Sequence, residues 1–229
     1  MMKKLGLISA AMALALSGTA AIAKVSQDEA NKLGNSLTPL GAEKAANADG
    51  SIPAWTGGIT AAPSGYSVGD HHPDPFADDK VKFEITGKNY KEYSEQLSPG
   101  LIALFEAYPD TFKMPVYETR RSASNPQAIY DATKTNATRA ELLDGGNGLK
   151  GAAIGIPFPI PENGLEAIWN HILRYRGEAV QRYGGQAAVT SSGDYNVIGF
   201  DEQLLINYAK PDITPEKLLE ENILFMFKQ

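Results

Sequence analysis

Residues 151–175 read GAAIGIPFPIPENGLEAIWNHILRY, and the rest of the chain is expected to be organised around them. Its first half is apolar, and each of its three prolines disfavours helical angles in the residue before it. Residues 154–161 are therefore predicted to be extended. The second half predicts a helix over 163–175, because Asn163 can cap the first turn and Glu166 can reach back to the Asn163 amide.

One face of this expected helix is apolar along its length. Its apolar residues follow the i, i+3, i+4, i+7, i+8 spacing of a buried stripe: Leu165, Ile168, Trp169, Ile172 and Leu173. Trp169 would bury the largest side chain of that stripe. The pattern ends at Arg176–Gly177, and the following residues favour strands. We therefore expect a long helix packed against an antiparallel sheet, which is an α+β fold.

The N-terminal residues 1–23 are predicted to be a secretory signal peptide. Lys3 and Lys4 precede an apolar run from Leu5 to Leu16, and Ala21-Ile22-Ala23 supplies a cleavage site. The apolar run is shorter than the roughly 20 residues that span a bilayer. The sequence thus predicts an exported, periplasmic protein with no membrane span after cleavage.

Composition excludes several classes of function. The chain has no cysteine, so neither a disulfide nor a lipid-anchoring cysteine is available. Its net charge of −6 argues against nucleic-acid binding, which needs a basic surface. The sequence contains no GxSxG, SxxK or HExxH string and only three histidines. We expect a non-catalytic protein without a cofactor.

Two regions follow the signal peptide. Residues 24–88 predict an irregular arm with one short helix starting at Ser26, and Trp55 is expected to anchor this arm on the body. Residues 89–229 predict helices and then the first strands of an antiparallel sheet. Helices are expected to start at Asn89, at Pro99 with a buried face that includes Leu104, Phe105 and Tyr108, and after Asn125-Pro126.

The C-terminal third has the period of two that is typical of strands, with Gly184-Gly185 as a hairpin candidate. Glu202 interrupts the alternation, which suggests a turn or bulge at Asp201-Glu202. The apolar positions are either ordinary core or the lining of an apolar ligand site with Tyr208 and Glu202 at its mouth. As a site, they are Ile198, Phe200, Leu204, Ile206, Tyr208, Ile223, Phe225 and Phe227.

The last predicted strand, residues 223–227, lies at the end of the chain. An apolar strand needs a partner at its edge and cover on its faces. We therefore expect the chain to be truncated after Gln229, as the N-terminal part of a longer protein.

Three further motifs favour structural interpretations. Gly146-x-Gly148-x-x-Gly151 matches a dinucleotide fingerprint in letters, but it follows a helix and opens into extended chain, so a flexible turn is favoured. His71 and His72 lie in a proline-broken acidic loop that favours solvation over metal binding. His171 is expected at the edge of the buried stripe, hydrogen-bonded to backbone.

Three stretches resemble a family of bacterial exported proteins labelled outer-membrane lipoprotein-sorting proteins. They are LTPLGAEKAANADGSIPAWTGG, GIPFPIPENGLEAIWNHILRYRG and ENILFMFKQ. The resemblance covers most of residues 37–229. It implies a Gram-negative envelope protein with a fold like the lipoprotein carriers LolA and LolB, an antiparallel incomplete β-barrel whose helices close a hydrophobic cavity. It also implies a link to exporters of hydrophobic compounds.

These observations leave two function classes. The first is a periplasmic binding protein or carrier for a lipid or other hydrophobic ligand, with an envelope exporter as a further partner. The second is an enzyme that acts on an envelope glycan or lipid through carboxylates.

Overall fold

The computed structural model describes residues 25–218 and the backbone of 225–228, so the predicted signal peptide lies outside the described residues. Helices and short antiparallel sheets mix in this part of the chain, which confirms the α+β class, and the described strands do not close into a barrel. No helix among these residues combines the length and hydropathy needed to cross a bilayer. The elements are α1 (Gln27–Ala30), β1 (Phe83–Thr86), η1 (Tyr90–Gln96), α2 (Pro99–Ala107), β2 (Lys113–Val116), α3 (Gln127–Asn136), β3 (Glu141–Leu142), η2 (Asp144–Gly146), β4 (Leu149–Lys150), α4 (Gly164–Ile172), β5 (Ala179–Val189), β6 (Tyr195–Leu205), η3 (Asn207–Ala209), α5 (Pro215–Leu218) and β7 (Phe225–Lys228).

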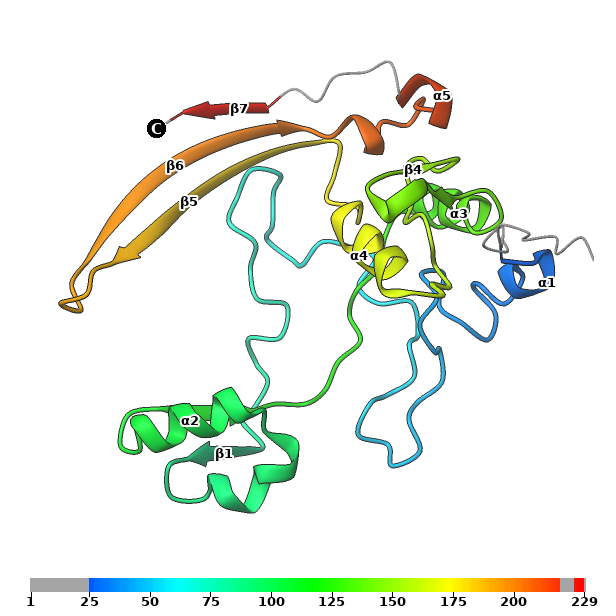
Figure 1. Cartoon of the computed structure of the whole chain (residues 1–229). Helices are drawn as coiled ribbons and strands as arrows, with labels where there is room; N and C mark the ends of the chain where they lie inside the picture. The colour runs from blue at the N-terminus through cyan, green and yellow to red at the C-terminus, as the bar shows by residue number, and fades with distance from the viewer. Residues whose placement is uncertain (1–24, 219–224, 229) are drawn as a thin grey trace, which may run out of the picture.

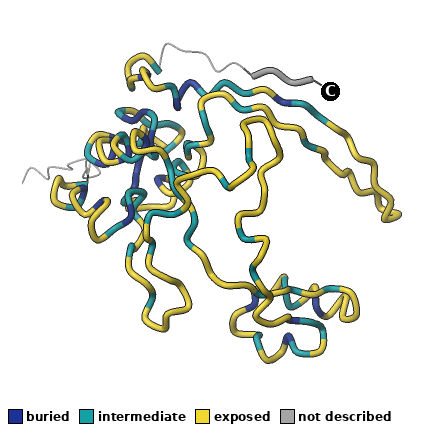
Figure 2. Tube along the Cα trace, turned by 180° about the vertical axis from the view of Figure 1, so that it is seen from behind, coloured by how far each residue is buried: buried dark blue, intermediate teal, exposed yellow. Residues whose placement is uncertain are grey.

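The body of the molecule forms around α1, α3, α4 and residues 152–160, where burial is concentrated (Figures 1 and 2). Two small apolar clusters hold it together. One joins Ala30 and Leu33 to Ala137, and the other joins Ala140, Ala152 and Phe158 to half-buried side chains that include Trp169. The proline-rich segment is therefore buried but lies in no strand or helix, and Ile154, which was predicted to be extended, instead has φ +68°.

Polar side chains on two helices fix the path of that segment. Asn136 of α3 donates from Nδ2 to the carbonyls of Ala153 (3.0 Å), Gly155 (3.2 Å) and Ile156 (3.3 Å), and its Oδ1 accepts from the Ala153 N–H. Asn170 of α4 accepts from the Phe158 N–H at 2.8 Å. Buried backbone groups that no strand can pair are thus satisfied by amide side chains.

Trp55 anchors the arm, as predicted. The indole N–H of Trp55 donates to the Ala123 carbonyl at 3.0 Å. Arg121 reinforces this contact by donating to the carbonyls of Glu43 (2.7 Å), Lys44, Ala45 and Pro53. Gly41 has φ +92°, and a Cβ there would lie 1.6 Å from the Pro159 carbonyl oxygen. Only glycine allows the arm to approach the body this closely.

Residues 83–116 form a distal module with its own apolar core, separated from the body (Figure 1). β1 pairs with β2, so residues 83–86, which the sequence placed in the irregular arm, are a strand. Helix α2 begins at Pro99 under a Ser98 cap as expected. Its predicted buried face is wrong in part, because Phe105 is buried whereas Leu104 and Tyr108 are exposed.

The expectation for α4 is half right. Asn163 accepts from the Glu166 N–H at 3.1 Å, so it caps the helix as predicted. The Glu166 carboxylate accepts from the Glu162 N–H at 2.7 Å, one residue earlier than predicted. The helix ends at Ile172, and its apolar stripe is not core: Leu165, Ile168 and Ile172 are exposed, and His171 is exposed beside them. Trp169 packs on the body rather than against the sheet.

Candidate ligand-binding sheet

The sheet that carries the predicted site is a long curved hairpin of β5 and β6, with β7 paired along the far side of β6 (Figure 1). The hairpin register runs unbroken from Ala179 opposite Leu205 to Val189 opposite Tyr195. Its turn is residues 190–194, where the Thr190 N–H donates to the Asp194 carbonyl at 2.8 Å and Gly193 has φ +88°.

The predicted turn at Gly184-Gly185 is therefore wrong. Both glycines lie in the middle of β5, opposite Phe200 and Gly199. Gly184 is needed for packing rather than for turning, because a Cβ there would lie 2.7 Å from the Phe200 ring. An aromatic side chain over a cross-strand glycine restores the cover that the glycine lacks.

The predicted break at Asp201-Glu202 is also wrong, because β6 continues through both residues. Since alternate residues of a strand point to the same side, Ile198, Phe200, Glu202 and Leu204 share one face of the sheet. Their cross-strand partners Gln186, Gly184, Arg182 and Val180 extend it. We call this surface the Phe200 face.

A charge pair lies in the middle of the Phe200 face. Arg182 donates from Nε and Nη2 to Glu202 Oε2, and its guanidinium also lies 5.6 Å from the centre of the Phe200 ring. Glu202 is only 8% exposed. A carboxylate can be this deeply buried because its charge is paired. The pair divides the apolar surface into an Ile198–Phe200 side and a Leu204–Val180 side.

The structure brings together only part of the predicted site. Ile198 is 48% exposed, and Phe200 and Leu204 are half-buried beside it on the same face. Ile206 lies just beyond the strand, where its N–H donates to the Glu178 carbonyl at 2.7 Å. In β7 the register places Phe225 opposite Leu204 and Phe227 opposite Glu202, while Ile223 lies outside the described residues.

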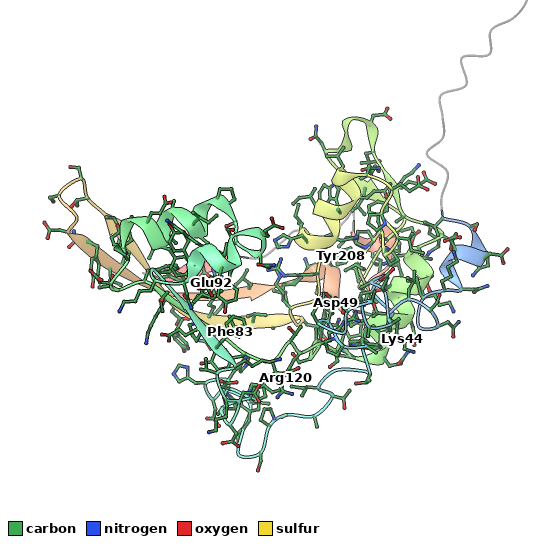
Figure 3. All side chains as sticks on the ribbon, turned by 90° about the horizontal axis from the view of Figure 1, so that it is seen from below. Lys44, Asp49, Phe83, Glu92, Arg120 and Tyr208 are labelled. Carbon is green, nitrogen blue, oxygen red and sulfur yellow. The ribbon has the colours of Figure 1, made fainter. Side chains whose placement is uncertain are left out.

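Tyr208 belongs to the body, not to the mouth of a site. Its hydroxyl donates to the Gly155 carbonyl at 2.6 Å, and its carbonyl accepts from the Ile154 N–H at 2.9 Å. Ile154 is the single described non-glycine residue with a positive φ, +68°, a strained conformation for a β-branched side chain. Tyr208 thus joins the end of β6 to this strained loop, whereas Phe83 and Glu92, also labelled in Figure 3, belong to the distal module.

Burial raises the pKa of the Tyr208 hydroxyl well above its usual value. Above about pH 10 an unfolded tyrosine ionises, whereas folded Tyr208 keeps its proton. Stability must therefore fall as pH rises from that point toward the folded pKa, by up to about 1.4 kcal/mol per pH unit.

We expect Tyr208→Phe to remove this loss of stability at alkaline pH. At about pH 7 the variant should lose only about 1 kcal/mol of unfolding free energy, because Asn136 still donates to the Gly155 carbonyl. Denaturant unfolding at about pH 7 and about pH 11 measures both effects. If wild type and variant lose the same unfolding free energy between the two pH values, burial does not raise the pKa of Tyr208.

The outer part of the hairpin is exposed on both faces (Figure 2). Tyr183, Tyr195 and Val197 lie on the face opposite to Phe200 and are all strongly exposed. Residues 183–200 contain a single charged residue, Asp194, although 21% of the whole chain is charged. This stretch is therefore a nearly uncharged and partly apolar surface in contact with solvent.

The other motifs have structural surroundings. His72 meets the Tyr66 ring edge-on, and Asp79 of the same acidic region binds Arg120 through both carboxylate oxygens. Gly146 lies in the short 3-10 turn between β3 and β4 and accepts from the Trp169 indole. Among the described residues, no group of three or more His, Asp or Glu side chains is placed to hold a metal ion.

Sequence reasoning missed Arg182 on the Phe200 face. The signal was the cluster Thr190-Ser191-Ser192-Gly193-Asp194, which contains the small and polar residues that turns prefer. Centring a hairpin there pairs Arg182 with Glu202 directly. Taking the double glycine as the turn hid that pair.

Comparison with known proteins identifies relatives but no activity. The model of a family described as "Protein of unknown function (DUF1329)" matches residues 84–229, more than half of the chain. Uncharacterized protein PA3922 of Pseudomonas aeruginosa is 47% identical over 226 residues, which are 99% of this chain and 49% of that protein. The chain thus spans about half the length of the curated relative it matches. No solved structure matches it significantly.

Proposed function

Because the chain belongs to the DUF1329 family, we propose from its sheet that the protein is a periplasmic, non-catalytic carrier for a lipid or other hydrophobic ligand. The observation that carries this proposal is the Phe200 face, where an exposed Ile198 adjoins half-buried Phe200 and Leu204 on a curved sheet. Burying such apolar surface under a ligand releases about 25 cal/mol per Å².

The exposed stripe of α4 supports the same function. Leu165, Ile168 and Ile172 offer a second apolar surface that the described body leaves uncovered. Ligand sites are mostly apolar, with a few placed polar groups. On the Phe200 face the Arg182–Glu202 pair would be such a polar group, next to the ligand's polar end.

We further propose that the sheet belongs to a LolA/LolB-like incomplete barrel. Its support is the antiparallel β5-β6-β7 order, in which strands that follow each other along the chain lie side by side. In a protein of the relative's length, further strands would extend the sheet beside β7. An exporter of hydrophobic compounds in the cell envelope is the proposed partner.

Two neighbouring substitutions test the carrier function, because they point to opposite faces of β6. Ile198→Asp should weaken binding of a fluorescent fatty-acid probe about tenfold, since it puts a charge against the acyl chain. Val197→Asp is the matched control and should bind the probe like wild type. Both residues are exposed, so both variants should remain folded, which circular dichroism checks.

Probe binding is measured by fluorescence titration of the full chain. A folded wild type that binds no probe at micromolar concentration would contradict the carrier function. Equal losses in the two variants would mean that the Phe200 face is not the binding surface.

A further inference from the structure

The outer edge of β5 is a long row of backbone groups without a strand partner in the described part of the chain. The Ile206 N–H donates to the Glu178 carbonyl, and the Thr190 N–H donates to the Asp194 carbonyl. Since inward and outward residues alternate in an antiparallel pair, the even-numbered residues of β5 bond to β6. The outward N–H and C=O groups belong to Ala179, Gln181, Tyr183, Gly185, Ala187 and Val189.

This edge lacks the features that protect natural edge strands. Proteins protect such edges with lysines, prolines, bulges or very short strands. β5 has eleven residues, no lysine, no proline and an unbroken register with β6, and its one charged side chain, Arg182, is paired with Glu202. Its outward residues are exposed, Tyr183 and Val189 most clearly among the large ones. An edge of this kind can accept another strand.

Strands later in the chain are not the expected occupant. Sequential strands of a meander add beside the preceding strand, so a strand after β7 would pair with β7 and leave the β5 edge open. We therefore look for an occupant in a second chain, and its sequence must fit β5.

We propose that this occupant is a second copy of the protein, which pairs its own β5 antiparallel to the first about a twofold axis at Gly184. In this register Gln181 faces Ala187 of the partner subunit, and Arg182 faces Gln186 of the partner subunit. Tyr183 meets Gly185 of the partner subunit, so each tyrosine covers a glycine. No like charges oppose each other, and the two outward rows of N–H and C=O groups bond to each other. The interface is isologous, as in most dimers.

The register makes a charge test specific. The double variant Gln181→Lys with Ala187→Lys places two lysines opposite each other on both sides of the axis. It should weaken the dimer about tenfold, because like charges directly opposite each other destabilise strand pairing. The matched variant Gln181→Lys with Ala187→Glu places opposite charges there and should keep or strengthen the dimer.

Sedimentation equilibrium of the full chain over a wide concentration range gives the dissociation constants, and circular dichroism confirms that each variant is folded. The proposal expects a wild-type dimer, a weakened lysine–lysine variant and a restored lysine–glutamate variant. A monomeric wild type at every concentration overturns it. A dimer equally stable in both variants also overturns it, since the contact would then lie elsewhere.

Discussion

Replacing Asn136 with alanine is expected to lower the free energy of unfolding by about 4 kcal/mol, because the Ala153 N–H and the Ile156 carbonyl would both lose their partner, at about 1–3 kcal/mol for each group. Asn136 is 0% exposed, and one side chain serves the backbone of Ala153, Gly155 and Ile156. Its loss would also release the strained Ile154, whose positive φ persists only while its neighbours hold it.

Thr135→Ala is the matched control on the same helix. Thr135 is exposed, and its hydroxyl bonds only to the Asp131 carbonyl one turn earlier. Its substitution should change stability by less than about 0.5 kcal/mol. Urea denaturation followed by the fluorescence of Trp55 and Trp169 measures both variants. A loss below about 1 kcal/mol for Asn136→Ala would mean that water or other donors satisfy these carbonyls.

The second large effect is expected in the distal module. Phe105 is 0% exposed, and its ring lies 5.6 Å from that of Tyr90 and 4.7 Å from that of Phe112, measured between ring centres. Phe105→Ala should therefore cost about 3–5 kcal/mol. The apolar core of the module draws only on residues 85–116, so we expect this loss to unfold the module alone.

Hydrogen exchange distinguishes local from global unfolding. In Phe105→Ala, amides of residues 83–116 should exchange rapidly, while amides of α3 stay protected and the fluorescence of Trp55 and Trp169 stays unchanged. Leu104→Ala is the matched control, because Leu104 is the exposed neighbour on α2. If the whole chain loses protection together, the module and the body unfold as one cooperative unit.

Local sequence patterns predicted most helix starts. Ser26, Ser98 and Asn163 each accept a backbone N–H at the first turn of their helix. The family match also confirms the prediction that the chain belongs to an uncharacterised family. That prediction needed no structure, because it rested on long sequence motifs.

Predictions of burial that rested on the periodicity of apolar residues failed in part. The stripe of α4 and the outer face of α2 have the spacing of core positions, yet parts of both are exposed.

The amino-acid sequence was sufficient to place most helix starts and to identify Trp55 as the anchor of the arm, because caps act through nearby contacts and a large aromatic side chain is strongly favoured to be buried. Only the tertiary structure decided the hairpin register, and with it the Arg182–Glu202 pair on the Phe200 face. A strand slipped by one residue exchanges its two faces, and the choice of turn depended on the fit of the Phe200 ring over Gly184. The tertiary structure also decided that Asn136 and Tyr208 hold the buried loop, since their partners are 17 and 53 residues away. No local pattern encodes contacts of that range.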